Sequence, residues 1–132
     1  MRKWVFSLLF LVWMALVTAA SLLRMEDVGP EAFEIPYGDK LGHFLFYAVA
    51  MFLALMALGE WLRGKMGFRR AAATAFAGLL AYGLLMEGLQ WAMQAGRSAE
   101  WADVVANSLG LVAGLYSAKG AFHSLRGLNW PD

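Results

Sequence analysis

The stretch DKLGHFLFYAVAMF, residues 39–52, places an aspartate, a lysine and a histidine in its first turn and a half and is strongly apolar from Leu45 onward. Its apolar part belongs to a longer run, Leu41 to Gly59, that contains no Asp, Glu, Lys or Arg. A helix needs about 20 apolar residues to cross a hydrocarbon core about 30 Å thick. The stretch therefore predicts a membrane-spanning helix with a polar entrance.

The composition supports a membrane protein. The chain has 132 residues, of which 61% are hydrophobic and only 16% are charged, whereas soluble domains contain about a quarter charged residues. A soluble domain of this size could not bury so much apolar surface. The absence of cysteine excludes disulfides and thiolate metal sites, and a net charge of +1 without a basic, aromatic-rich cluster gives no case for nucleic-acid binding. We predict one integral membrane domain over residues 1–132.

Three further runs have the length and composition of membrane spans. Trp4 to Leu23 has no charge, Ala71 to Ala95 is interrupted only by Glu87, and Trp101 to Ala118 contains Asp103 near its start. Apolar residues surround each segment on every side, as expected for helices in lipid. The sequence predicts an all-α integral membrane protein with four transmembrane helices, at about residues 4–23, 41–62, 71–95 and 101–122.

The first run has an alternative interpretation. Arg2 and Lys3 precede an apolar stretch that ends in VTAAS, which is the pattern of a secretory signal with a small-residue cleavage site. Twenty residues are long for the apolar core of a signal, and three later spans need a starting point for insertion. We therefore expect the run to be retained as a helix.

The distribution of Lys and Arg predicts the orientation, because cytoplasmic flanks carry the excess of positive charge. With four spans, eight basic residues share the side of the termini: Arg2, Lys3, Arg63, Lys65, Arg69, Arg70, Lys119 and Arg126. The other side has Arg24, Lys40 and Arg97. We expect both termini in the cytoplasm, with Trp4, Trp61 and Trp130 near the inner interface and Trp91 and Trp101 near the outer one.

In this orientation the polar residues of the spans gather in one layer near the outer surface. They come from the start of the second span, the end of the third and the start of the fourth: Asp39, Lys40, His43, Tyr47, Glu87, Gln90, Gln94, Arg97, Glu100, Asp103 and Asn107. Spacings of three, four and seven residues put three sets of these side chains on single helix faces, namely Lys40 with His43 and Tyr47, Glu87 with Gln90 and Gln94, and Asp103 with Asn107. Facing lipid would cost Glu87 about 2.5–3.5 kcal/mol or more. The layer should face the bundle interior, and the other half of the bundle should be almost purely apolar.

Two glycines extend the polar face of the fourth span. Gly110 and Gly114 follow Asn107 at helical spacing, and small residues allow two membrane helices to approach closely. We expect a close helix crossing there, with Asp103 and Asn107 directed into the bundle.

Three blocks of the sequence resemble the signature blocks of the VanZ-like family of small polytopic bacterial membrane proteins: DKLGHFLFYAVAMFLAL, YGLLMEGLQ and GRSAEWADVVANSLGLVAG. The resemblance covers roughly residues 36–116. The family's commoner glutamate block has another polar residue before the Gln, where this chain has Gly88 and Leu89. The resemblance implies a multi-pass protein of the bacterial inner membrane, in a family named for reduced susceptibility to the lipoglycopeptide teicoplanin.

The function expected from these residues is the binding of an anionic lipid-linked or lipidated envelope molecule. Lys40 and Arg97 would hold the anion, and Asp39, Glu87 and Asp103 would hold those cations in place. The remaining ligand-binding candidates are His43, Tyr47, Gln90 and Asn107. Partners are thus a membrane lipid or a lipid-linked precursor, with no nucleic acid, and a homo-oligomer is compatible with the sequence.

Two alternatives stay open. The protein would be an intramembrane enzyme if His43 and Glu87 acted as acid and base, although no nucleophile motif, phosphate loop or HExxH motif is present. It would be an accessory or structural subunit if the polar layer only held the helices together. No cofactor or metal is expected, because the layer's potential ligands come from three spans and show no ligand spacing.

Overall fold

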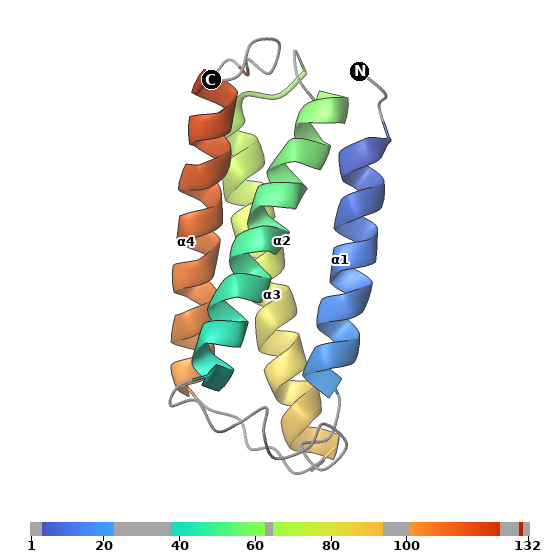
Figure 1. Cartoon of the computed structure of the whole chain (residues 1–132), viewed down its shortest axis with the longest axis vertical. Coiled ribbons are helices and arrows are strands. Elements are labelled where there is room, and N and C mark those ends of the chain that lie inside the picture. Colours follow the sequence, from blue (N-terminus) through green and yellow to red (C-terminus); the bar gives the residue numbers. More distant parts are fainter. Residues whose placement is uncertain (1–3, 23–37, 63–64, 94–100, 125–129, 131–132) are drawn as a thin grey trace.

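The computed structural model describes residues 4–22, 38–62, 65–93, 101–124 and 130. These residues form four helices: α1 (Val5–Leu22), α2 (Gly38–Leu62), α3 (Phe68–Met93) and α4 (Trp101–Ser124). Helices α1 and α3 run in one direction and α2 and α4 in the other, so the chain goes up and down through a four-helix bundle (Figure 1). The predicted all-α fold with four helices is confirmed. Helices α2 and α3 each begin three residues before the predicted span, at Gly38 and Phe68.

Three of the described helices are long and apolar enough to cross a membrane, namely α1, α2 from Lys40 and α3 as far as Ala92. Helix α4 has 24 residues and is long enough, but it is more polar because it carries Asp103, Asn107, Ser108 and Ser117. On α1 only Val17 and Ser21 are buried, and Leu8, Leu11 and Leu16 are each more than half exposed. Exposure of such an apolar surface to water would be unfavourable, whereas its contact with lipid carries no such free-energy cost.

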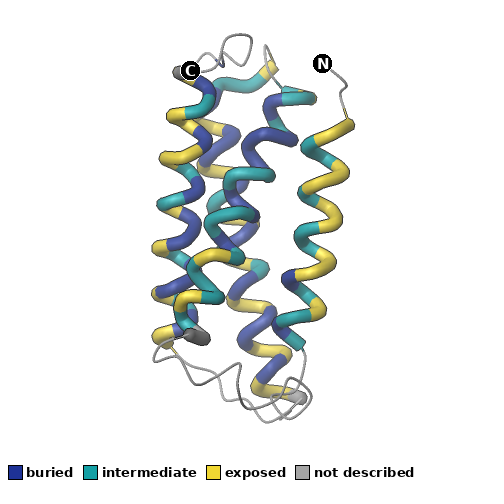
Figure 2. Tube along the Cα trace, viewed as in Figure 1, coloured by how far each residue is buried: buried dark blue, intermediate teal, exposed yellow. Residues whose placement is uncertain are grey.

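The core lies between α2, α3 and α4, where the buried positions of each helix face inward (Figure 2). Met51, Leu55 and Leu111 have no exposed surface. Helix α2 has the central position, because it packs on the other three helices and most extensively on α4. The pair α2 and α4 therefore determines which side chains meet at the polar end of the bundle.

The contact between α2 and α4 depends on two glycines. A Cβ atom on Gly110 would collide with the backbone oxygen of Phe44, and one on Gly114 would collide with that of Ala48. Only glycine allows the two backbones to come this close. Because the two helices run in parallel, residues further along α4 contact residues further along α2. At the start of both helices Asp103 contacts Lys40, and Asn107 contacts His43. Further along, Gly110 lies against Phe44 and Ala48, and Gly114 lies against Ala48 and Met51.

The opposite end of the bundle is not purely apolar, and that expectation was wrong. The half-buried Glu60, near the end of α2, accepts hydrogen bonds at the start of α1 from the backbone N–H groups of Phe6 (3.1 Å) and Ser7 (2.9 Å) and from the Ser7 hydroxyl (3.0 Å). The indole N–H of Trp61 donates to the same hydroxyl at 2.8 Å. A carboxylate at a helix N-terminus satisfies free N–H groups and interacts favourably with the helix dipole. Glu60 therefore caps α1 from the neighbouring helix.

We expect Glu60→Ala to lower the free energy of unfolding by about 1–2 kcal/mol, in the upper part of the range of about 0.5–2 kcal/mol for removal of a helix N-cap. Glu60→Gln keeps an acceptor oxygen and should lose less. Chemical unfolding in detergent micelles, followed by helical circular dichroism, measures both effects. Equal stability of Glu60→Ala and wild type would show that the cap contributes nothing to the fold.

Candidate functional site

An ion pair joins the first turns of α2 and α4. The ammonium group of Lys40 donates a hydrogen bond of 2.5 Å to Oδ1 of Asp103. The lysine side chain retains 25% of its accessible surface, whereas that of Asp103 retains 7%. Lys40 therefore lies at the rim of the site and Asp103 lies inside it. An oppositely charged neighbour is what a carboxylate needs when it is removed from water.

His43 lies one turn further into the bundle and connects the same two helices. Its Nδ1 is 2.9 Å from Oδ1 of Asn107, and its Nε2 is 3.6 Å from Oδ2 of Asp103. An amide oxygen only accepts hydrogen bonds, so this contact makes Nδ1 the donor. In a neutral imidazole, Nε2 then carries the lone pair and faces Asp103. The His43 side chain is 12% exposed, which places it inside the bundle.

Helix α3 adds a second carboxylate to this group. Glu87 is 6% exposed, and one ligand atom from each of Glu87, His43 and Asp103 lies within 4.8 Å of the others. Nitrogen and carboxylate oxygen atoms in this arrangement suit a divalent transition metal, and they also suit proton exchange between an acid and a base. We refer below to Lys40, His43, Glu87, Asp103 and Asn107 as the polar cluster.

A glycine on α3 makes room for the inner part of the polar cluster. A Cβ atom on Gly83 would lie 3.1 Å from Nδ2 of Asn107 and 3.2 Å from the hydroxyl of Tyr47. Tyr47 is buried, with 2% of its surface exposed, and its ring lies beside that of Tyr82. Gly83 was not among the residues predicted from the sequence, although a glycine one helical turn before Glu87 on the same helix face was a usable signal.

Two further contacts fasten α1 to the same half of the bundle. The amide of Gln90 donates a hydrogen bond of 2.5 Å to the backbone oxygen of Ser21, near the end of α1. One turn deeper, the hydroxyls of Thr18 and Tyr82 are hydrogen bonded. Gln90 therefore satisfies one of the last carbonyl groups of α1, which have no partner within the helix.

The structure brings together most of the residues that the sequence placed in one layer. All members of the polar cluster lie at the end of the bundle where α2 and α4 begin and α3 ends (Figure 1), and Tyr47 and Gln90 lie beside them. Arg97, Gln94 and Glu100 lie outside the described residues, and the side chain of Asp39 is also outside them. Within the described residues, Lys40 supplies the positive charge of the cluster, and Asp103 and Glu87 supply the negative charges.

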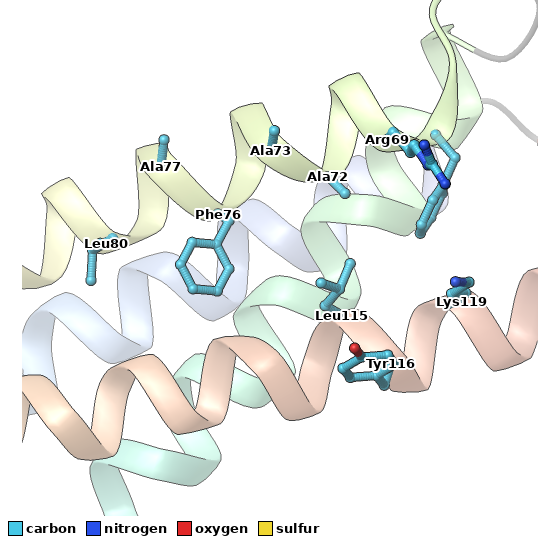
Figure 3. Close-up of a pocket in the computed structure, with 10 residues that line it drawn as sticks. Arg69, Ala72, Ala73, Phe76, Ala77, Leu80, Leu115, Tyr116 and Lys119 are labelled. Atoms are coloured by element: carbon cyan, nitrogen blue, oxygen red, sulfur yellow. The ribbon is translucent and has the colours of Figure 1, made fainter. Parts of the chain in front are cut away.

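A groove between α3 and α4 lies near the other end of the bundle (Figure 3). It has a volume of about 560 Å³, and its walls are mostly alanine, leucine and aromatic side chains. Arg69 and Lys119 line it at one end, and Tyr116 lies next to Lys119. This groove is separate from the polar cluster and was not expected from the sequence.

Comparison of the chain with protein-family models, with curated proteins and with solved structures gives no match. The three sequence blocks at residues 39–55, 82–90 and 96–114 contribute, in order, Lys40 and His43, then Glu87, then Asp103 and Asn107 to the polar cluster. Each block thus supplies at least one member of a single buried group.

Proposed function

We propose that the protein crosses the bacterial inner membrane four times, as a VanZ-like protein with both termini in the cytoplasm and the polar cluster in the outer leaflet. The positions of basic residues support this orientation: the end of the bundle opposite the polar cluster carries Lys65, Arg69, Arg70 and Lys119. Exposed tryptophans occur at both ends, Trp4 and Trp61 at one and Trp91 and Trp101 at the other, as is typical of the two membrane interfaces. Helix α4 is the fourth span, and α2 covers much of its polar face.

This orientation predicts the signals of topology reporters. A fusion within residues 63–70 or at the C-terminus is expected to report the cytoplasm, and one within residues 24–38 the extracytoplasmic side. Alkaline phosphatase, active only outside, and green fluorescent protein, fluorescent only inside, give opposite signals at each position. Inverted signals would place the polar cluster in the inner leaflet and contradict the proposed site.

We further propose that the polar cluster binds the anionic head group of a lipid-linked or lipidated envelope molecule. The observation that carries this proposal is the position of Lys40, which is partly exposed at the rim of an otherwise buried polar group. An incoming phosphate or carboxylate would replace Asp103 as a partner of the ammonium group. Arg97, in the segment just before α4, would add a planar pair of donors suited to the same oxygen atoms.

The Arg97 series tests this function. We expect Arg97→Lys to weaken retention of undecaprenyl phosphate, since the charge stays and the paired donors are lost, and Arg97→Gln to weaken it by about tenfold or more. Native mass spectrometry of the protein in detergent measures the bound fraction, with phosphatidylcholine as the neutral competitor. Arg70→Gln, at the opposite end of the bundle, is the matched control and should retain the lipid as the wild type does.

A double variant separates ligand binding from structure. If Arg97 only forms an ion pair with Glu87, then Arg97→Gln destabilises the protein and the added change Glu87→Gln restores stability and retention together. If Arg97 binds the anion, the double variant stays defective in retention whatever its stability. Recovery of retention in the double variant would contradict the proposed function.

A second candidate function is an intramembrane enzyme that acts on such a lipid-linked substrate. The observation in its favour is that His43, Glu87 and Asp103 come together in a buried group. His43 and Glu87 would then transfer protons, with Asn107 fixing the ring orientation. Under this hypothesis Glu87→Gln abolishes turnover of the lipid and leaves its binding intact, whereas simple binding predicts no turnover in the wild type.

A further inference from the structure

We propose that His43, Glu87 and Asp103 form a binding site for one divalent transition-metal ion of the Zn²⁺ or Mn²⁺ class. The sequence alone predicts no metal, because these residues lie on three different helices without a recognisable spacing. The bundle places their ligand atoms within 4.8 Å of one another inside the protein. The proposal concerns the site itself and does not depend on which lipid the protein binds.

The distance between the ligand atoms of His43 and Asp103 is close to the separation of two ligands of a bound ion. Zinc binds nitrogen and oxygen ligands at about 2.0–2.2 Å, so two ligands of a tetrahedral ion lie about 3.4 Å apart. The 3.6 Å between Nε2 of His43 and Oδ2 of Asp103 is near this value and is too long for a hydrogen bond. A carboxylate oxygen of Glu87 lies within 4.8 Å of the ligand atoms of His43 and Asp103, so the three side chains would have to move closer together around a bound ion.

The neighbours of the ligands orient them as partners of metal ligands usually do. Asn107 accepts the hydrogen bond from Nδ1 of His43, which leaves the Nε2 lone pair directed at the centre of the group. Lys40 binds Oδ1 of Asp103, and the other oxygen, Oδ2, is the one that faces His43. His43 and Asp103 therefore each bind a protein partner with one polar atom, Nδ1 or Oδ1. The second polar atom of each, Nε2 or Oδ2, lies on the side of the proposed metal ion.

The charges also fit a dication. With a neutral imidazole, the two carboxylates and the single ammonium group give the polar cluster a net charge of −1. A divalent ion changes this charge to +1. Three protein ligands leave a coordination position free, as in catalytic zinc sites, and a phosphate oxygen could occupy it. The competing account places a proton on His43 instead of a metal ion, so that an imidazolium lies between the two carboxylates.

Metal titration distinguishes the two accounts. The protein is purified in detergent without a polyhistidine tag and is freed of metal with a chelator. It is then titrated with Zn²⁺ or Mn²⁺ by isothermal titration calorimetry. Elemental mass spectrometry measures the number of metal ions bound per chain. We expect one ion per chain. His43→Gln and Glu87→Gln should each weaken binding more than tenfold, and Asn107→Leu about 10–100-fold, as expected for a residue that orients a ligand.

The only other histidine provides the matched control. His123 is exposed near the end of α4, away from the polar cluster, and His123→Gln should bind metal as the wild type does. For variants that fail to fold, Co²⁺ added to the wild-type protein gives a visible absorption band if it enters a four-coordinate site. Absence of stoichiometric binding and of this band in the wild type, or binding that is lost with His123 and kept without His43, would overturn the proposal.

Discussion

Alanine at Gly110 or Gly114 is expected to lower the free energy of unfolding by about 2–3 kcal/mol, which is large for the addition of one methyl group. At either position the new Cβ would collide with the backbone of α2, at the oxygen of Phe44 or of Ala48, and at Gly114 it would also lie 2.8 Å from Cβ of Met51. A backbone oxygen cannot move aside as the end of a flexible side chain can. The two helices must separate, and the contacts of Asp103 and Asn107 with α2 would weaken with them.

Gly120→Ala is the matched control on the same helix. A Cβ at Gly120 meets nothing within 4 Å, so alanine should be neutral or stabilising by up to about 1 kcal/mol through its higher helix propensity. Unfolding in detergent, followed by circular dichroism, measures all three variants. If Gly110→Ala and Gly114→Ala are as stable as Gly120→Ala, the close contact between α2 and α4 does not exist in the protein.

The second large effect is expected for Asp103→Asn. This change keeps the shape of the side chain but removes the charge that balances Lys40, and it weakens the contact with Nε2 of His43. Removing one partner of a fully buried ion pair lowers the free energy of unfolding by about 3–5 kcal/mol. Because Lys40 is partly exposed and water can solvate its charge, we expect Asp103→Asn to lower it by about 2–3 kcal/mol. The loss of folded protein is measured by the same unfolding assay.

A double-mutant cycle isolates the pair. Lys40→Gln combined with Asp103→Asn leaves no unbalanced charge from the ion pair, so the double variant should be more stable than the sum of the two single effects predicts. Lys119→Gln, an exposed lysine at the other end of α4, is the control and should change stability little. Strict additivity of the Lys40 and Asp103 effects would contradict a direct interaction between them.

The polar layer could be predicted from the sequence because two simple rules determine it. The alternating direction of successive helices brings the start of α2, the end of α3 and the start of α4 to one end of the bundle, and the spacing within each helix puts Lys40 with His43 and Asp103 with Asn107 on single faces. The pairing across helices could not be predicted, because it depends on the parallel register of α2 and α4. That register is set by the approach of Gly110 and Gly114 to the α2 backbone, which is a property of the packed bundle.

Other features had no clear signal in the sequence. Glu60 looks like an ordinary charged residue at the end of a span, and its role as a cap appears only when α1 begins beside the end of α2. The groove of Figure 3 is lined by Phe76 and Leu80 from α3 and by Leu115 and Tyr116 from α4, so its shape depends on how the two helices pack. The contributions of Asp39 and Arg97 to the site stay predictions, since these side chains lie outside the described residues.

Photo-crosslinking can locate the anionic ligand, which we propose binds at the polar cluster. An analogue of undecaprenyl phosphate with a diazirine next to the phosphate is added to membranes that contain the protein, and crosslinked peptides are identified by mass spectrometry after illumination. We expect crosslinks within residues 38–47 and 97–107, and their loss in Arg97→Gln. Crosslinks concentrated instead within residues 68–80 and 115–119, around Arg69 and Lys119 in the groove of Figure 3, would contradict it.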